Sequence, residues 1–369
     1  MKNKSKYNVA VIGVGVVGIE MLRCLKQRNF PVGELRVFAR SARDIEVDND
    51  IYSVQAISND SFNDIDIALF AGTEGEKGAA VAYASEAVKR GAVVIDNGAD
   101  FRMQKDVPLV VPEVNAADIK KHKGIIANPN CSTIQMVVAL WPIHKKVGIK
   151  RVIVTTLQAA SGAGRGAVEQ LWKETEEIVL RSQKSALRLR SGLMVSEVEP
   201  SEDRSQNFLS SVLCHLSSEK AMPQQLAYNV FPHIGGFSDY DYTSEEWKLV
   251  KETHKIMHAD KMKISATTVR VPVRTGHSES VYIETEKNIT PAQVKALLSK
   301  APGTIVVDDI NNNLYPMPKD VEGKDEVFIG RIRRDPFVKN GLWLWVVADN
   351  LLKGAALNAV QIAEYLVTK

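Results

Sequence analysis

The feature that most constrains the fold lies near the start of the chain, where a strand pattern runs into a glycine loop and then into a helix pattern. Residues 7–12 form a short apolar run rich in β-branched side chains, and Gly13-Val14-Gly15-Val16-Val17-Gly18 follows at once. Met21, Leu22 and Leu25 then recur at helical spacing. A Gly-x-Gly-x-x-Gly loop in this setting predicts the first strand, turn and helix of a parallel α/β unit.

Each glycine of this loop has its own physical role. The first permits a tight turn, the second lets the backbone approach a pyrophosphate, and the third lets helix pack closely on strand. The helix N-terminus adds unpaired N–H groups that attract phosphate. We therefore predict a dinucleotide site rather than a purely structural glycine turn. Its predicted contacts are Gly13, Gly15, Val16, Val17 and Gly18.

Strand and helix patterns continue to alternate after this unit. Extended patterns at 34–39, 66–70 and 92–96 predict a doubly wound, Rossmann-like domain. In open parallel sheets the loops after the strands line the ligand crevice. Gly72 and Thr73 follow the second of these strands and are candidate cofactor contacts. Arg102 follows the third and is either an anion binder or a solvated arginine.

The end of the strand at 34–39 indicates which nucleotide is bound. An NAD site typically has an acidic residue there, which binds the ribose hydroxyls. This chain instead has Arg40 and Ser41. A guanidinium and a hydroxyl suit a 2′-phosphate, so we predict NADP rather than NAD, the alternative being an ordinary basic loop.

A candidate nucleophile follows the last strand pattern of this domain. The turn Asn128-Pro129-Asn130 interrupts an apolar run, and a helical pattern begins at Ser132. Cys131 is therefore at a helix N-terminus, or one residue before it. The unpaired N–H groups and helix dipole there stabilise a thiolate and predict a lowered thiol pKa. The alternative is a buried, inert cysteine.

The composition excludes several other kinds of protein. With 369 residues, of which 45% are hydrophobic and 25% charged, the chain can form two ordinary globular domains. A net charge of +3 argues against a nucleic-acid partner, and no apolar run is long enough to span a membrane. Cys24, Cys131 and Cys214 form neither a disulfide framework nor a metal-ligand pattern, so we expect a cytoplasmic protein with no metal site.

The second half of the chain begins with an extended segment at 151–157 that leads into Gln158. The glycine-rich turn at 161–166 precedes another helix pattern. Within it, Ser161 and Gly162 either approach a bound cofactor closely or belong to a flexible connector.

A helix is predicted at 243–258, where Thr243 and Glu246 form a capping box. Glu245 and Lys248 share one face of this helix, a spacing that usually marks a surface ion pair. The rest of the chain predicts a second domain, built on a mixed or antiparallel sheet with helices on one face, and a final amphipathic helix at 350–367. The extended segments lie at 263–274, 279–284, 304–308, 326–331 and 342–348.

Five segments together resemble the aspartate-semialdehyde dehydrogenase family over nearly the full length of the chain. Their order and spacing make the resemblance specific, although the glycine loop is one residue shorter than the family's usual Gly-x-x-Gly-x-x-Gly. The segments are Pro129-Asn130-Cys131-Ser132-Thr133, Gln158-Ala159-Ala160-Ser161-Gly162-Ala163-Gly164, Glu245-Glu246-Trp247-Lys248, Arg270-Val271-Pro272-Val273-Arg274-Thr275-Gly276-His277-Ser278 and Asn350-Leu351-Leu352-Lys353-Gly354-Ala355-Ala356.

The resemblance implies an activity and a set of catalytic residues. The activity is the reversible, NADPH-dependent reductive dephosphorylation of L-4-aspartyl phosphate to L-aspartate 4-semialdehyde, in lysine, threonine and methionine biosynthesis. Cys131 would be the nucleophile that forms a thioacyl intermediate, and His277 the acid/base catalyst. Gln158 would orient the thioacyl group.

The resemblance also implies how the substrate and cofactor are bound. Arg270 would bind the substrate α-carboxylate and Glu245 its amino group, while Asn350 would face the cofactor. Residues 1–131 with 350–369 would form the NADP domain and 132–349 the catalytic and dimerisation domain of a homodimer or a dimer of dimers. The predicted phosphate contacts are Arg102, Asn130 and Lys248.

Two other functions are compatible with parts of this pattern. A sister acyl-phosphate or acyl-CoA reductase, such as malonyl-CoA reductase, uses the same thioacyl chemistry. It has less need for the Glu245 and Arg270 pair, which suits an amino-acid substrate. A non-catalytic NADP-binding sensor needs the glycine loop but no cysteine and histidine together, so its function would survive the loss of Cys131.

Overall fold

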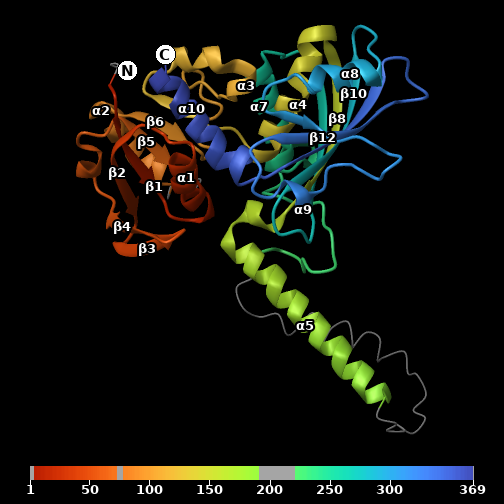
Figure 1. The fold of residues 1–369 in the computed structure, drawn as a ribbon, viewed down its shortest axis with the longest axis horizontal. Helices are drawn as coiled ribbons and strands as arrows, with labels where there is room; N and C mark the ends of the chain where they lie inside the picture. Colours follow the sequence, from red (N-terminus) through yellow and green to blue (C-terminus); the bar gives the residue numbers. More distant parts are fainter. Residues whose placement is uncertain (1–3, 73–77, 191–220, 369) are drawn as a thin grey trace.

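The computed structural model describes residues 4–72, 78–190 and 221–368. Two β-sheets lie side by side, each covered by helices, and the long helix α5 (Arg165–Arg190) projects away from both (Figure 1). The predicted cofactor contact Thr73 and the cysteine Cys214 lie outside the described residues.

The first sheet has seven strands in the order β3-β4-β2-β1-β5-β6-β7, and all neighbours are parallel except β3 and β4. β5 and β6 are buried along their whole length, as expected for central strands covered on both faces. This confirms the predicted doubly wound domain. The strands are β1 (Tyr7–Ile12), β2 (Val32–Ala39), β3 (Arg43–Val47), β4 (Asp50–Ala56), β5 (Ile67–Phe70), β6 (Val93–Asp96) and β7 (Ile125–Ala127).

Helices cover both faces of this sheet. α1 (Val16–Gln27) and the C-terminal α10 (Leu357–Thr368) share one apolar cluster, and α2 (Ala79–Lys89) packs on the opposite face. The C-terminal helix thus returns to the first sheet, beside α1 (Figure 1). Short turns complete this half: η1 (Asn59–Phe62), α3 (Pro112–Asn115) and η2 (Ala116–Lys121).

The hairpin of β3 and β4 at the edge of this sheet was not among the predicted strands. Its two-residue turn, Asp48 and Asn49, has positive φ angles of +51° and +69°. Such a turn matches the right-handed twist of the two strands it joins, and asparagine and aspartate tolerate this conformation. The Asp-Asn pair between alternating residues is the sequence signal that would have revealed it.

The second sheet has six strands in the order β11-β12-β13-β10-β8-β9 and is mixed. β8 pairs with β9 in parallel and with β10 antiparallel, which confirms the predicted second domain type. The strands are β8 (Ile149–Gln158), β9 (Lys263–Arg270), β10 (His277–Thr285), β11 (Thr304–Val306), β12 (Val327–Arg334) and β13 (Gly341–Ala348).

One long helix forms the centre of this second half. α4 (Cys131–Val147) is buried over most of its length between the sheet and α7 (Ser244–Met257), in the largest apolar cluster of the described chain. Its first residue is Cys131, so the packing of α4 sets the place of the thiol. The remaining helices here are α8 (Pro291–Leu298), α9 (Pro318–Val321), η3 (Ala160–Ala163) and η4 (Asp239–Asp241).

The final helix departs from its predicted continuous form. The segment η5 (Leu352–Ala356) is a π-helical turn, and the α-helix α10 begins only after it. A π-turn shifts the helical register by one residue and is often found at functional sites. Here it lies next to α4 and α1, between the two sheets.

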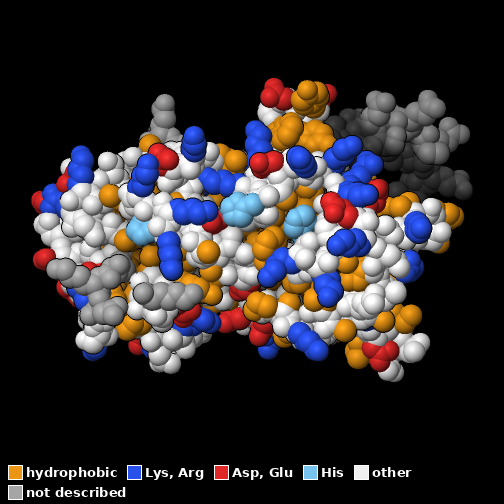
Figure 2. All heavy atoms as spheres, turned by 90° about the horizontal axis from the view of Figure 1, so that it is seen from above, with side chains coloured by type: hydrophobic (Ala, Val, Ile, Leu, Met, Phe, Trp, Pro, Cys, Tyr) orange, Lys and Arg blue, Asp and Glu red, His pale blue; other side chains and the backbone are white. Residues whose placement is uncertain are grey.

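Charged side chains are dispersed over the surface. On the face shown in Figure 2, lysine and arginine side chains are spread along the molecule, with acidic side chains between them. Among the helices of the described residues, none combines the length and apolarity needed to cross a bilayer.

Candidate active site

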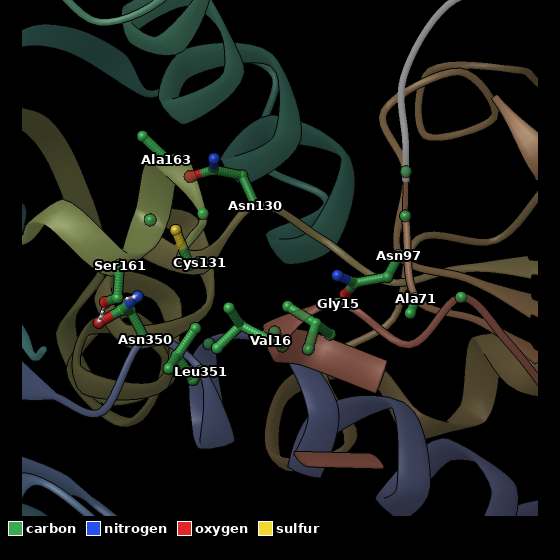
Figure 3. A pocket seen from close by; sticks show the side chains of 18 of the residues that line it. Gly15, Val16, Ala71, Asn97, Asn130, Cys131, Ser161, Ala163, Asn350 and Leu351 are labelled. Carbon is green, nitrogen blue, oxygen red and sulfur yellow. Dashed lines mark hydrogen bonds between the residues drawn. The ribbon is translucent and has the colours of Figure 1, made fainter. Parts of the chain in front are cut away.

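A cavity of about 540 Å³ lies where the two halves of the molecule meet. Cys131, Asn130, Ser161 and Asn350 lie along one side of it, and Gly15, Ala71 and Asn97 lie along the other (Figure 3). The structure therefore places the predicted cysteine and the predicted glycine loop in one pocket. Its further lining residues include Arg102, Gln158, Gly162, Glu245, Lys248, Arg270 and His277.

The thiol is placed by the capped start of α4. Asn130 is the N-cap residue, and its side-chain oxygen accepts hydrogen bonds from the N–H groups of Ser132 at 3.1 Å and Thr133 at 3.2 Å. These bonds satisfy two of the donors that a helix start leaves unpaired. Cys131 is the first residue of α4, as predicted, and is half-buried.

The predicted lowering of the Cys131 pKa is wrong. Burial away from water, followed by the negative charge of Glu245, raises the pKa of this thiol to about 12. The charges of Arg102 and Arg270 and a hydrogen bond from the Ser132 backbone act in the opposite direction but are outweighed. Cys131 is therefore a neutral thiol near pH 7, because desolvation opposes the charged form more than the helix start favours it.

We expect alkylation of Cys131 by iodoacetamide to accelerate steadily with pH, up to about pH 10. The thiolate is the reactive form, and below the pKa its fraction rises about tenfold per pH unit. Peptide mass spectrometry can follow Cys131 separately from Cys24 and Cys214. A rate that levels off near neutral pH would show that the helix start outweighs desolvation and that the raised pKa is incorrect.

His277 is held in one tautomer at the start of β10, an inner strand of the second sheet. It begins β10, is fully buried, and its Nδ1 accepts a hydrogen bond from the Ala159 N–H at 3.1 Å. Burial and then the positive charge of Arg270 lower the pKa of His277 to about 3, so the ring is neutral. Because Nδ1 is an acceptor, the proton of the neutral ring is on Nε2. Nε2 has no hydrogen-bond partner within the described residues.

Gly162 lies directly against the imidazole ring of His277. A β-carbon at position 162 would lie 2.9 Å from His277 Cε1, 3.0 Å from Nε2 and 3.3 Å from an Arg270 nitrogen. The missing side chain therefore leaves room for the imidazole and the guanidinium, and any larger residue would displace them.

Glu245 is the centre of a buried polar network. Its Oε1 accepts hydrogen bonds from Asn130 Nδ2 at 2.8 Å and Gln158 Nε2 at 2.9 Å, and Lys248 Nζ lies 3.5 Å from Oε2. Burial favours the neutral form of Glu245, but the charge of Lys248 and the two amide hydrogen bonds outweigh it and lower its pKa. Glu245 is therefore an ionised carboxylate that also fixes the two amide side chains. Gln158 Nε2 further contacts Ser132 Oγ.

Arg102 forms an ion pair with Glu252, which also binds the loop 128–130 before Cys131 (the cysteine loop). Its Nη1 donates to Glu252 Oε1 at 3.0 Å and its Nη2 donates to the Asn97 carbonyl at 2.9 Å. Glu252 Oε2 in turn accepts from the Asn130 N–H at 2.7 Å. Burial raises the pKa of Glu252 against the opposing charge of Arg102. The arginine is thus a buried, positioned cation rather than a solvated one.

Arg270 ends β9 and reaches the pocket from the second sheet. The side chain is buried, and Nη1 donates to the carbonyl of Ala159, whose N–H holds His277. Burial lowers the pKa of Arg270, with Glu245 and Cys131 opposing that effect. An arginine pKa lies so far above neutrality that the guanidinium keeps its charge. Among the described residues, the lining of the pocket thus includes the carboxylate of Glu245 and the cations Arg102, Lys248 and Arg270, with Arg165 as a fourth cation.

The glycine loop has the backbone that a phosphate site requires. Gly13 has φ +98°, and a β-carbon on Gly18 would lie 1.8 Å from the Gly13 carbonyl oxygen. A β-carbon on Gly15 would meet no atom within 4 Å, so this residue leaves open space in the pocket. α1 begins with no side-chain cap, and its first N–H groups remain available to an anion. The loop therefore fits a dinucleotide pyrophosphate.

The other predicted cofactor contacts fall into two groups. Val16, Val17 and Gly72 line the same pocket, as do Ser161 and Asn350, whose side chains hydrogen-bond to each other at 3.0 Å (Figure 3). Arg40 and Ser41 follow β2, are exposed, and do not line the cavity. Their predicted contact with the 2′-phosphate therefore stays a prediction.

Sequence reasoning missed three functional positions. Glu252 is seven residues after Glu245 on α7, a spacing that returns to the same helix face and could have identified it. Asn97 binds Arg102 only through a backbone carbonyl, which leaves no side-chain signal. Gly354 packs against Cys131, and no local pattern indicates that contact. Within the ranges the structure describes, no group of three His, Cys, Asp or Glu side chains could hold a metal ion.

Two family models match the chain. The NAD binding domain of semialdehyde dehydrogenase matches residues 8–122, and the semialdehyde dehydrogenase dimerisation domain matches residues 140–353. The first covers the glycine loop and the first sheet except β7. The second covers the sheet with Arg270 and His277.

Relatives match over nearly the whole chain. The chain is 49% identical to the aspartate-semialdehyde dehydrogenase of Aquifex aeolicus over 98% of both chains, and 46% identical to that of Bacillus subtilis over 97% of both. A crystal structure of aspartate semialdehyde dehydrogenase II from Vibrio cholerae, complexed with ASA, has 39% identity, 99% coverage of both chains and a TM-score of 0.84. The chain belongs to the aspartate-semialdehyde dehydrogenase family.

Proposed function

We propose that this chain is an NADP-dependent aspartate-semialdehyde dehydrogenase, which reduces L-4-aspartyl phosphate to L-aspartate 4-semialdehyde with release of phosphate. The observation that supports it most is one pocket in which a thiol, a neutral histidine and complementary charges meet a glycine loop. Lysine, threonine and methionine biosynthesis use this product.

The charges of the pocket suit an amino acid with a phosphorylated side chain. Arg270 offers a planar guanidinium that can bind the α-carboxylate through two parallel hydrogen bonds. The ionised Glu245 suits the α-ammonium group. Arg102, Asn130 and Lys248 suit the phosphate, because two are cations and the third is an amide donor on the loop before the thiol.

The acyl-transfer step follows from the states of Cys131 and His277. Sγ of Cys131 attacks the acyl carbon, the bond from carbon to the phosphate oxygen breaks, and the thiol proton ends on the departing phosphate. His277 Nε2–H can donate a hydrogen bond to the acyl oxygen as negative charge develops there. Gln158, tied to Glu245, borders the same space and orients the thioester. When the carbon–sulfur bond later breaks, the sulfur leaves as a thiolate and takes up a new proton from water.

The nucleotide half of the pocket fits NADP. Gly13, Gly15 and Gly18 would hold the pyrophosphate, and Asn350 and Ser161 would border the nicotinamide side. When bound, reduced NADP supplies the hydride that converts the thioester to the aldehyde level.

The same proposal includes the organisation of the whole enzyme. Residues 1–131 and 350–369 form the NADP domain, since α10 packs beside α1, and 132–349 form the catalytic and dimerisation domain. The chain acts in the cytoplasm as a homodimer. Two such dimers can associate into a tetramer.

One assay tests this function directly. Purified protein should reduce NADP in the presence of aspartate semialdehyde and phosphate, and omission of phosphate should stop the reaction. Malonyl semialdehyde with coenzyme A is the comparison that tests the malonyl-CoA reductase alternative. Activity only with that pair, or with neither, would contradict the proposal. The second result would favour a nucleotide-binding sensor.

The two ends of the substrate can be separated by mutation. We expect Arg270→Lys to raise the KM for aspartate semialdehyde strongly with little change in NADP affinity, because an ammonium cannot replace the guanidinium fork. Arg102→Ala should mainly raise the phosphate concentration that the oxidative reaction needs. Steady-state kinetics in both substrates measure these effects. If Arg102→Ala left phosphate dependence unchanged while Arg270→Lys abolished it, the substrate would bind in the opposite orientation, with its phosphate at Arg270 and its α-carboxylate at Arg102.

The proposed preference for NADP can be tested at Arg40. We expect Arg40→Ala to weaken binding of NADP much more than binding of NAD, because only NADP has the 2′-phosphate that a guanidinium can bind. Titration of each nucleotide against intrinsic fluorescence measures both affinities, with Arg43→Ala as a neighbouring control. Equal losses for both nucleotides would show that Arg40 does not contact the 2′-phosphate.

A further inference from the structure

A lysine is completely buried next to the active site and takes no part in the proposed chemistry. Lys353 lies in η5 with an exposed fraction of 0%. Its Nζ donates to both carboxylate oxygens of Glu113, at 2.8 and 2.7 Å, to Asn358 at 3.0 Å and to Gln361 at 2.7 Å. Glu113 comes from α3, and its side chain is only 10% exposed. The ammonium is fully satisfied at a site with no access to solvent.

The residue after this lysine touches the nucleophile. A β-carbon on Gly354 would lie 2.8 Å from Cβ of Cys131 and 3.3 Å from its Cα. The π-helical turn therefore packs its backbone directly against the start of α4. A shift of η5 by a fraction of an ångström would either crowd the thiol or leave a gap beside it.

The same segment is also bonded to the other parts of the pocket. Asn350 Oδ1 accepts from the Gly276 N–H at 2.9 Å, immediately before His277, and Asn350 pairs with Ser161 (Figure 3). Asn128 Nδ2 donates to the Ala355 carbonyl at 3.2 Å, and Asn358 Nδ2 donates to Asn128 Oδ1 at 2.7 Å. Residues 350–358 thus contact the cysteine loop at Asn128, the residue before His277 and the glycine-rich turn at Ser161.

We propose that Lys353 and Glu113 are a positioning pair, which fixes η5 so that Gly354 and Asn350 hold Cys131 and His277 in reacting geometry. A buried ion pair is a poor source of net stability, since an apolar pair of the same shape often stabilises as well. Its directional bonds do, however, select one arrangement of the π-turn. This inference rests on the proposed function only for which reaction the kinetic assay follows. The contacts of Lys353 and Glu113 do not depend on it.

Three variants separate positioning from stability. Lys353→Met removes the ammonium but keeps most of the side-chain volume, and Lys353→Met with Glu113→Gln removes both charges. Glu113→Gln alone keeps the shape and one acceptor oxygen. The matched control is Lys295→Met, which removes the partner of the buried Asp308, 2.8 Å from Lys295 Nζ, at a site that does not line the pocket.

Each variant is measured in three ways: thermal unfolding, steady-state kinetics per folded molecule, and the alkylation rate of Cys131 by iodoacetamide. We expect kcat to fall by up to about 10²-fold in the Lys353 variants, the effect of small misplacements of reacting groups. The KM for aspartate semialdehyde should change little. Alkylation should accelerate because Gly354 no longer packs tightly on the thiol. Lys295→Met should lower only the unfolding temperature.

A variant series that lowers the unfolding temperature but leaves kcat and Cys131 alkylation at wild-type values would overturn the positioning role. If the single lysine variant does not fold, the double variant and Glu113→Gln decide by the same criteria. The wild-type protein is measured in the same assays, and its failure to turn over aspartate semialdehyde would count against the proposed function and not against the positioning pair. Alkylation reports on the geometry of the thiol even if the substrate is a different acyl compound.

Discussion

Cys131→Ala should abolish turnover and leave the fold and nucleotide binding nearly intact. The expected loss in kcat is on the order of 10⁶-fold, as for a hydrolase that loses its nucleophile. The reason is that no other described sulfur lines the pocket, while the glycine loop that binds the nucleotide lies on its opposite side. The phosphate-dependent assay measures activity, and nucleotide titration measures binding.

Cys24→Ala is the matched control for this variant. Cys24 lies in α1, is buried, and burial raises the pKa of its thiol to about 12, much as for Cys131. It does not line the cavity, so its replacement should leave activity at the wild-type level. Activity above a few per cent in Cys131→Ala, measured as a fraction of this control, would exclude the covalent mechanism.

His277→Asn should lower kcat by roughly 10²- to 10⁴-fold, the range for a lost general acid or base. The imidazole Nε2–H is the donor that the structure holds toward the pocket, while its Nδ1 is fixed by the Ala159 N–H. The shorter side chain of asparagine cannot accept the Ala159 N–H and at the same time donate to the acyl oxygen, as the imidazole ring does. Single-turnover measurements of thioester formation and of reduction would show which step loses the donor.

His144→Asn provides a control with the same local hydrogen bond. His144 Nδ1 accepts the Ile149 N–H at 3.0 Å, as His277 Nδ1 accepts the Ala159 N–H, but His144 lies outside the pocket. Its replacement should affect stability without changing kcat. Similar kinetic losses in both variants would mean that His277 acts only through the backbone it supports.

The nucleotide half could be predicted from sequence because its signals are local. Gly13 and Gly18 are required by a tight turn and a close helix, which depend on neighbours within one strand-turn-helix unit, and Gly15 leaves open space in the pocket. The capping box of Thr243 and Glu246 is equally local, and the structure shows it. Family resemblance, rather than any local signal, connected Arg270, Glu245 and His277, which lie on different elements and meet only in the folded chain.

What the sequence by itself determined is thus the type of the two sheets and the local units with their own signals, including a helix that starts at Cys131 or directly after it. The edge hairpin β3–β4 and the π-turn η5 were not predicted. Only the tertiary structure decided the protonation states, because desolvation depends on everything that packs around a group. It raises the pKa of Cys131 although the helix start favours a thiolate, and it keeps His277 neutral. The π-turn that seats Gly354 on Cys131 also comes from packing between segments more than 200 residues apart in the chain, which no local pattern encodes.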